Sequence, residues 1–414
     1  MSGWIIEHQC PQCGGHVKLE ESDHLLTCQY CRVRLYLVSP DYFRYCLIPQ
    51  DIPEQEIIFA PYWRVKGMEF WCTQKGLQHR VVDTSFLSAG HSALPQSLGL
   101  RPQALKLHFA VPGSKARFLT SEMPFKAAFS RWTDQGKEAY SPLAKDRLFF
   151  REFIGETVSM IYAPLYLKDE SVYDAILKRP EERQVKKNGA DSFAFTVPDG
   201  KEITFIPTLC PLCGWQLEGV NESCVLLCVH CDSAWQASAT GFNKTAHEVA
   251  DAQEGDVLYV PFWKIKADVE GEKLRTYADL IRFANLPKAV QQEWEDRELY
   301  FWSPAFKIQP NLFLRIAKQI TGFQPCLQTQ DRLGNRTFYP VTLPASEAAE
   351  SIKVTLAELV LDKKKGYPRV SNIKISVRES SLAFLPFVIR SNELVACHMG
   401  FSIDRNALKF GRNI

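Results

Sequence analysis

This 414-residue sequence lacks several kinds of feature that would point directly to a function. No stretch approaches eighteen uncharged apolar residues, so we expect no transmembrane segment. Residues 1–8 contain no basic segment followed by an apolar run, so we expect no secretory signal. There is no Walker loop, dinucleotide-binding fingerprint, nucleophile elbow, H-E-x-x-H helix or calcium loop. These absences argue against the common nucleotide-binding, hydrolase and metalloprotease chemistries.

The sequence also lacks an excess of charge of one sign. It contains 49 Lys and Arg against 47 Asp and Glu, a formal net charge of +2. Residues 1–200 contain 24 basic and 23 acidic residues, which leaves 25 and 24 for residues 201–414. Proteins that bind nucleic acid gather Lys and Arg on one face. The even balance of both halves argues against nucleic acid as a partner.

Candidate catalytic residues are dispersed. His79, His91 and His108 fall within about thirty residues, but their spacing places no two of them on one helix face. We therefore predict no catalytic residue and no cofactor-binding residue other than metal ligands. No small-molecule substrate is evident, and we expect the protein not to be an enzyme.

The sequence does contain a duplicated cysteine pattern. Two C-x2-C pairs, separated by fourteen residues, occur twice at an offset of 200. The predicted metal ligands are Cys10, Cys13, Cys28 and Cys31, and Cys210, Cys213, Cys228 and Cys231. Two thiolates three residues apart can hold one ion from a tight turn, and the second pair completes a tetrahedron. Each half is therefore predicted to bind one metal ion with no vacant ligand position.

The remaining five of the thirteen cysteines are scattered and do not form a disulfide framework. They are Cys46, Cys72, Cys224, Cys326 and Cys397. Thiolates held by metal, with other thiols free, are typical of a reducing compartment. We therefore expect a cytoplasmic protein.

The first knuckle of each half, Cys10 to Gly14 and Cys210 to Gly214, resembles the Cys-Pro-x-Cys-Gly knuckle of the zinc-ribbon family. The resemblance covers about 40 residues of each half and implies two Zn²⁺ per chain. It does not imply a process, since such ribbons occur in transcription, translation, replication and scaffolding proteins. The second knuckles lack proline and glycine, which favours zinc over the iron of rubredoxin-like sites. His24 and Cys224 occupy equivalent positions and are either spare ligands or ordinary hairpin residues.

The duplication extends beyond the cysteines. Residues 10–67 align with 210–267 without a gap. Further on, residues 104–107 resemble 305–308, and Pro164 corresponds to Pro386. We expect the extra length of the second half to lie around residues 328–366.

Each metal module is followed by an apolar run that leads into a proline and aromatic residues, at 56–66 and 256–266. The alternation after the proline predicts strands, and the missing N–H predicts that Pro61 and Pro261 lie at an edge or a bulge. We expect the Tyr62-Trp63 and Phe262-Trp263 pairs to be core. The alternative is a stacking surface for bases or a peptide.

These patterns predict an α+β protein that is internally duplicated, with two zinc ribbons each fused to a β-rich domain with helical insertions. Apolar spacing predicts helices over 287–299, over 311–321 and after Ser346, the last ending at Lys363 to Lys365. The predicted segments are ribbon 1 at 1–38, domain 1 at 39–200, ribbon 2 at 201–240 and domain 2 at 241–414, with a charged connector at 178–189.

Three functions are compatible with the sequence. The first is an adaptor or assembly protein that contacts a protein partner or itself, which suits rigid metal-stapled modules and a neutral surface. The second is a nucleic-acid-binding ribbon protein, supported by Arg32 and Arg34 beside the first site and weakened by Asp232 beside the second. The third is a redox protein with iron in the same thiolates.

Overall fold

The computed structural model describes residues 5–39, 41–49, 52–53, 56–91, 94–99, 106–110, 116–129, 147–168, 171–180, 194–196, 203–238, 241–252, 256–397 and 399–411. The chain forms two compact units. The first comprises residues 1–66, 83–144 and 157–207, and the second comprises residues 67–82, 145–156 and 208–414. The mixture of sheets and helices confirms the α+β class.

Strands dominate the first half of the chain. They are β1 (Ile5–Gln9), β2 (His16–Glu20), β3 (Leu25–Thr27), β4 (Arg34–Val38), β5 (Phe43–Leu47), β6 (Ile58–Thr73), β7 (Gly76–Leu87), β8 (Lys106–Phe109), β9 (Arg117–Leu119), β10 (Leu148–Lys168), β11 (Ser171–Asp174), β12 (Arg179–Pro180), β13 (Phe195–Thr196) and β14 (Thr204–Pro207). The main sheet has the order β13-β9-β6-β10-β5-β8-β1-β2, and β14-β4-β3 form a second sheet.

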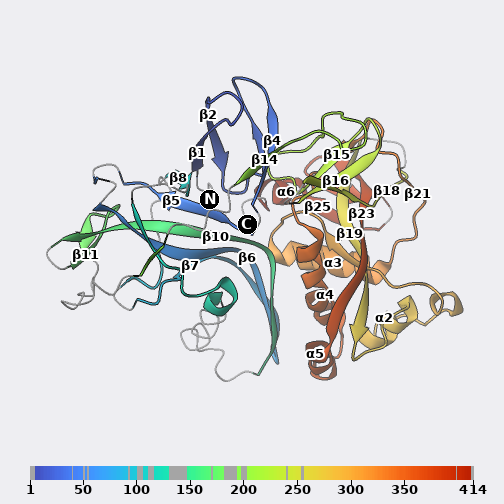
Figure 1. Cartoon of the computed structure of the whole chain (residues 1–414). Coiled ribbons are helices and arrows are strands. Elements are labelled where there is room, and N and C mark those ends of the chain that lie inside the picture. Colours follow the sequence, from blue (N-terminus) through green and yellow to red (C-terminus); the bar gives the residue numbers. More distant parts are fainter. Residues whose placement is uncertain are drawn as a thin grey trace. The chain divides into compact units, whose positions relative to one another are not determined.

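The second half combines strands with helices. Its strands are β15 (Val225–Cys228), β16 (Ser233–Ser238), β17 (Gly241–Thr245), β18 (His247–Ala250), β19 (Val257–Glu270), β20 (Phe301–Pro304), β21 (Thr329–Gln330), β22 (Thr337–Phe338), β23 (Lys374–Arg390), β24 (Glu393–Ala396) and β25 (Ser402–Asp404). Its helices are α2 (Tyr277–Ala284), the 3-10 turn η3 (Gln292–Trp294), α3 (Pro310–Phe323), α4 (Ala345–Leu359), α5 (Lys363–Asn372) and α6 (Arg405–Gly411). Figure 1 shows α3, α4 and α5 beside the long β19 and β23 strands of this unit.

The same five-stranded arrangement occurs in both halves. The order β9-β6-β10-β5-β8 of the first corresponds to β22-β19-β23-β18-β21 of the second. The pairs β6/β9 and β19/β22 are parallel, as are β5/β10 and β18/β23. The registers also agree, since Leu165 faces Asp174 and, 222 residues later, Phe387 faces Ala396. The predicted duplication therefore includes the sheets, but the predicted gap-free alignment of 10–67 with 210–267 is wrong at β5, whose counterpart β18 lies at an offset of 203.

Trp63 and Trp263 have the same role in the two halves. The indole N–H of Trp63 donates to the carbonyl of Met123 at 2.9 Å, and that of Trp263 donates to the carbonyl of Leu343 at 2.8 Å. Both tryptophans are buried, as is the aromatic residue before each. These residues are core, as predicted, and the alternative of a stacking surface is wrong for them.

The two prolines lie inside long strands, and the prediction of an edge or a bulge is wrong. On one side β19 pairs with β22 as far as Tyr259 and with β20 from Phe262 onward. Pro261 lies between these two neighbours, and its carbonyl accepts a hydrogen bond from Ala305 at 3.1 Å. The N–H and C=O of one strand residue point to the same side of the strand. An N–H of residue 261 would therefore point to the side where β19 changes its partner from β22 to β20. Proline at this position removes no hydrogen bond between paired strands.

Most of the extra length of the second half, 17 of 22 residues by offset, lies between β19 and β20, and the prediction that placed it at 328–366 is wrong. The N–H groups of Ser88 and Ala305 donate to Pro61 and Pro261 respectively, so the offset has already grown from 200 to 217 at this point. The added residues form α2 and η3. Strand pairing shows that the counterpart of β8 is β21, at an offset of 222. The predicted alignment of 104–107 with 305–308 is therefore also wrong. Residues 104–105 of this segment lie outside the described residues.

Two of the three predicted helices are confirmed. They are α3 and α4, whereas residues 287–299 contain only the short η3. The helix of this region is α2, which begins at a capping box formed by Thr276 and Asp279. Lys363 to Lys365 do not end α4, because they begin α5 after the N-cap Asp362.

Distal parts of β6, β7 and β10 belong to the second unit, within segments 67–82 and 145–156. There the ring of Phe70 lies 6.4 Å from that of Phe313 on α3. The backbone N–H of Gly155 donates to Glu347 on α4 at 3.0 Å. These compact units therefore do not follow the single division at residue 200 that the sequence suggests. The predicted connector at 178–189 lies outside the described residues beyond Pro180.

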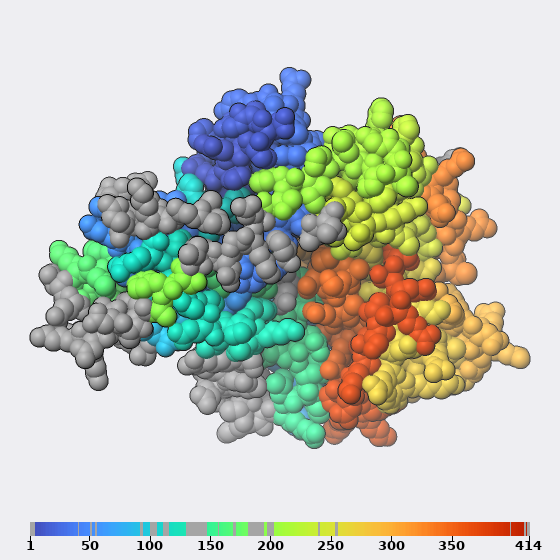
Figure 2. Space-filling view, viewed as in Figure 1, coloured from blue at the N-terminus to red at the C-terminus, as the bar shows by residue number. Residues whose placement is uncertain are grey.

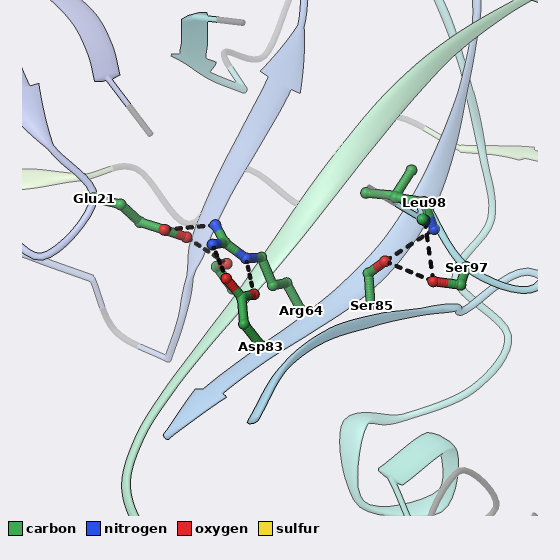
Figure 3. Close-up of polar contacts among 8 residues, drawn as sticks. Glu21, Arg64, Asp83, Ser85, Ser97 and Leu98 are labelled. Atoms are coloured by element: carbon green, nitrogen blue, oxygen red, sulfur yellow. Dashed lines mark hydrogen bonds and ion pairs between the residues drawn. The ribbon is translucent and has the colours of Figure 1, made fainter. Parts of the chain in front are cut away.

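A buried ion cluster attaches the first ribbon to the main sheet (Figure 3). Arg64 on β6 contacts Glu21 at 2.5 Å and binds both oxygens of Asp83 at 2.9 and 3.0 Å. Glu21 lies in the turn after β2 and also accepts a hydrogen bond from Ser159 at 3.4 Å. The side chains of Arg64 and Glu21 are only 7% and 8% exposed, so each charge depends on its partner for solvation.

We predict that Arg64→Leu lowers the free energy of unfolding by about 3–5 kcal/mol, because it leaves Glu21 buried beside no cation. The matched control is Lys264→Leu at the duplicated position, whose ion pair with Glu248 is 24% and 22% exposed. Denaturant titration of both variants measures the difference. Equal losses of unfolding free energy in the two variants would show that burial of the Arg64 cluster does not increase the cost of removing its cation.

We also predict that Trp263→Phe lowers the free energy of unfolding by about 1–3 kcal/mol, because the carbonyl of Leu343 loses its donor in a buried site. Trp215→Phe is the control, since Trp215 is 55% exposed. Thermal unfolding should separate the two variants clearly. An unchanged Trp263→Phe protein would contradict the role given to the indole N–H.

Candidate metal centres

Each half of the chain places two cysteine pairs on tight loops. In the first half, Cys10 and Cys13 lie in the loop between β1 and β2, and Cys28 and Cys31 lie between β3 and β4. Each loop is closed by backbone hydrogen bonds, such as Gly14 N–H to Cys10 C=O at 2.8 Å and Arg32 N–H to Cys28 C=O at 2.9 Å. The hairpins thus present both sulfur atoms of a pair toward one point.

The second knuckles reach the required backbone conformation without glycine. Gly14 and Gly214 have φ values of 73° and 72°. At the equivalent place in the second knuckles, Arg32 and Asp232 have φ values of 60° and 48°. An aspartate tolerates this left-handed region better than most residues. The Asp232 carboxylate also accepts hydrogen bonds from the N–H groups of Leu333 and Gly334, which stabilises the turn.

The sulfur atoms of each half converge on one site. All four Sγ atoms of a set lie within 4.8 Å of one another. In the first set, Cys10 to Cys31 is 3.8 Å and Cys13 to Cys28 is 3.6 Å. In the second set, the equivalent distances are 3.6 and 3.5 Å. A tetrahedron with metal–sulfur bonds of about 2.3 Å has edges of about 3.8 Å, so both sets fit a bound ion.

Polar groups lie beside sulfur atoms of both sets, and the thiol pKa values within the sets are split, since burial raises the pKa of Cys228 to about 12. The backbone N–H of Cys31 lowers the pKa of the Cys28 thiol to about 6. In the second set, the hydroxyl of Ser233 lies 3.0 Å from Cys231 Sγ and accepts a hydrogen bond from the indole of Trp235 at 2.8 Å. A hydroxyl at this position can donate to the sulfur and stabilise its negative charge. The first set has Val33 in the equivalent place.

Ser233 is therefore a site residue that the motif search missed. The two copies do differ at this position, because Ser233 replaces Val33 directly after the second knuckle. The sequence does not show, however, that this side chain points toward the sulfur atoms.

None of the other candidate ligands joins a cluster. His24 stacks on Tyr36 with ring centroids 5.8 Å apart. Cys224 donates to the carbonyl of Val341 at 3.3 Å, and burial raises its thiol pKa to about 12. His79 lies on β7 and His108 on β8. Among the described residues, the two cysteine sets are the groups of His, Cys, Asp or Glu found suited to hold a metal ion.

Comparison with known proteins adds no assignment, since no family model, curated protein or solved structure matches the chain. The longest helix of the described part of the chain, α4, has 15 residues, and none of the described helices has the length and hydropathy needed to cross a bilayer.

We predict two metal ions per chain. Cys13→Ser and Cys213→Ser should each reduce the metal content of purified protein from two ions to one, because three thiolates hold the ion far less tightly than four. Cys326→Ser is the control, since Cys326 is exposed and lies outside both sets. Elemental analysis by mass spectrometry gives the counts. Fewer than two ions in the unaltered protein would contradict the prediction.

Proposed function

We propose that this protein is a non-catalytic, zinc-binding adaptor or assembly protein that contacts a protein partner or a second copy of itself. In this proposal Zn²⁺ occupies both cysteine sets and staples two modules that are too small to hold a core of their own. Four thiolates leave no position on the ion for a substrate. The metal then supplies rigidity, and the residues around it supply recognition.

The observation that carries the proposal is an apolar tip on the second ribbon. We use this name for the exposed side chains of Leu209, Leu212 and Trp215, which are 50%, 62% and 55% exposed. They surround the first knuckle and the exposed Cys213. In the first ribbon the equivalent residues are Gln9, Gln12 and Gly15. The two ribbons thus share a scaffold and differ in the surface that they offer.

The aromatic residues of the apolar tip are held in place. The ring of Trp215 stacks on that of His230 with centroids 5.0 Å apart. In the first ribbon Gly15 replaces the tryptophan. The ring of Tyr30, at the position equivalent to His230, lies directly over this glycine. A rigid, exposed indole on a metal-stapled loop is a typical anchor for a protein interface. Figure 2 shows the second ribbon as a yellow-green surface of its unit.

Zinc is the metal that we propose, because the second knuckles reach their left-handed turns with Arg32 and Asp232 and not with the glycines of iron-binding rubredoxin-like sites. All thirteen cysteines are free of disulfides, which supports a cytoplasmic or other reducing compartment. Iron would make the purified protein red and would overturn this assignment.

Charge supports a protein partner over nucleic acid. Arg32 lies beside the first site, but Asp232 takes its place in the second and uses its carboxylate within the fold. A protein that binds several phosphates needs a concentration of basic residues, and its affinity falls steeply with salt. The nearly even charge of both halves offers no such concentration.

The test replaces the apolar tip by the residues of the first ribbon. We predict that the double variant Leu212→Gln with Trp215→Gly keeps two metal ions and loses at least tenfold in binding to its partner, because the anchor is removed while the ligands remain. The control is Lys244→Gln on the exposed strand β17. Quantitative affinity purification from the native source identifies the partner, and sedimentation of the purified protein detects self-association.

Two outcomes would contradict this proposal. One is equal recovery of every partner, and equal self-association, by the double variant and the unaltered protein. The other is submicromolar nucleic-acid binding at about 150 mM salt that Arg32→Ala abolishes without changing the zinc content.

A further inference from the structure

A cavity of about 280 Å³ lies in the second unit, between the sheet and the C-terminal helix α6. Its walls come from β19, β23, β24 and α6, together with the residue that follows β22. This volume is at the lower end of the range for ligand pockets. With about 30 Å³ for a group the size of a water molecule, it can hold about nine such groups.

The walls of the cavity are apolar. They consist of the side chains of Leu258, Tyr339, Ile389, Leu394 and Leu408. Leu394, Leu408 and Tyr339 are buried, and Leu258 and Ile389 are half-buried. Water in such a space makes few hydrogen bonds, so an aliphatic chain gains free energy by replacing it.

The remaining lining residues are two cations on α6. Arg405 and Lys409 are four residues apart, so they lie on the same face of the helix, and both are exposed. A carboxylate that lies between them would interact with both cations. Arg405 is positioned by a hydrogen bond from its guanidinium to the carbonyl of Ser391 at 3.0 Å.

The helix over the cavity is anchored at both ends. At its start, the N–H of Arg405 donates to the carbonyl of Asn392 at 2.9 Å. The hydroxyl of Tyr339 donates to the carbonyl of Leu408 at 3.0 Å. At its end, Gly411 packs so closely on Ile308 that a Cβ atom there would lie 2.8 Å from the Ile308 backbone. These contacts hold α6 in place, so the cavity is a built feature of the unit.

In the first half, the residues equivalent to three of the lining residues pack into a hydrophobic cluster. The counterparts of Leu258, Tyr339 and Leu394 are Ile58, Leu119 and Val172, all buried in one hydrophobic cluster. Ile176, just after β11, packs against the same cluster. The tyrosine is particular to the second half, since Leu119 takes its place in the first, whereas the positions equivalent to Arg405 and Lys409 lie outside the described residues.

We propose that this cavity binds a small amphipathic anion, a straight-chain carboxylate of about six to nine carbons. The aliphatic chain occupies the space between β19, β23 and α6, and the carboxylate lies at the mouth between Arg405 and Lys409. This binding is independent of the adaptor function, because the cavity shares no residue with the apolar tip or with the metal ligands.

The experiment measures binding to the full zinc-loaded chain by calorimetry with three probes: octanoate, octan-1-ol and acetate. Octanoate should bind with one site per chain. Octan-1-ol lacks the charge and acetate lacks the chain, so each should bind at least tenfold more weakly. Octanoate that shows no saturable binding, or that binds no better than both other probes, would overturn the proposal.

Variants locate the site. The double variant Arg405→Gln with Lys409→Gln should weaken octanoate binding at least tenfold and leave octan-1-ol binding unchanged, which also shows that the cavity remains folded. Ile389→Trp should fill the cavity and abolish binding of both chains. Arg390→Gln, on the opposite face of β23, is the control for loss of a nearby positive charge and should bind octanoate normally. Normal octanoate binding by both the double variant and Ile389→Trp would place the ligand elsewhere.

Discussion

Convergence of four sulfur atoms on one point is the constraint on which each ribbon depends. Four thiolates this close repel one another, and a metal cation between them would remove that repulsion. The rest of the first unit is built onto that geometry. Glu21, in the turn after β2, accepts a hydrogen bond from the buried Arg64 of β6. This contact helps to position the ribbon, and it also neutralises the charge of Arg64 inside the sheet.

The sequence was sufficient to predict the two converging cysteine sets and the fold class, because cysteine spacing and period-two alternation are local properties. It also identified Trp63 and Trp263 as core, since large apolar residues in apolar strands are seldom exposed. It was not sufficient for the position of the insertion, because weak likeness between residues 104–107 and 305–308 outweighed a strand pairing that only the structure reveals. The prolines were misplaced for a related reason: a change of pairing partner along one strand leaves no mark in the sequence.

The two halves show how one duplicated scaffold acquires different surfaces. Beside the cysteine sets, Val33 is replaced by Ser233, which adds a hydroxyl close to the sulfur atoms. At the tip, Gln12 and Gly15 are replaced by Leu212 and Trp215. In the sheet, the buried Arg64 cluster is replaced by the half-exposed pair of Lys264 and Glu248. The strand order and the tryptophan hydrogen bonds did not change, which indicates that they define the fold and that the other positions were free to diverge.

The division of β6, β7 and β10 between the two units bears on how the chain is synthesised. Met68, Phe70 and Ile154 belong to the core of the second unit, yet they leave the ribosome long before Phe313 and Leu343, against which that core is built. During translation these apolar segments are therefore synthesised before the residues that cover them. Contacts over such sequence separations form slowly. A chain cut at residue 207 would keep the hydrophobic clusters of the first unit in its first fragment, whereas the second fragment would lack the part of its core that residues 67–82 and 145–156 supply. The second unit therefore cannot be separated from the first by a cut at one point.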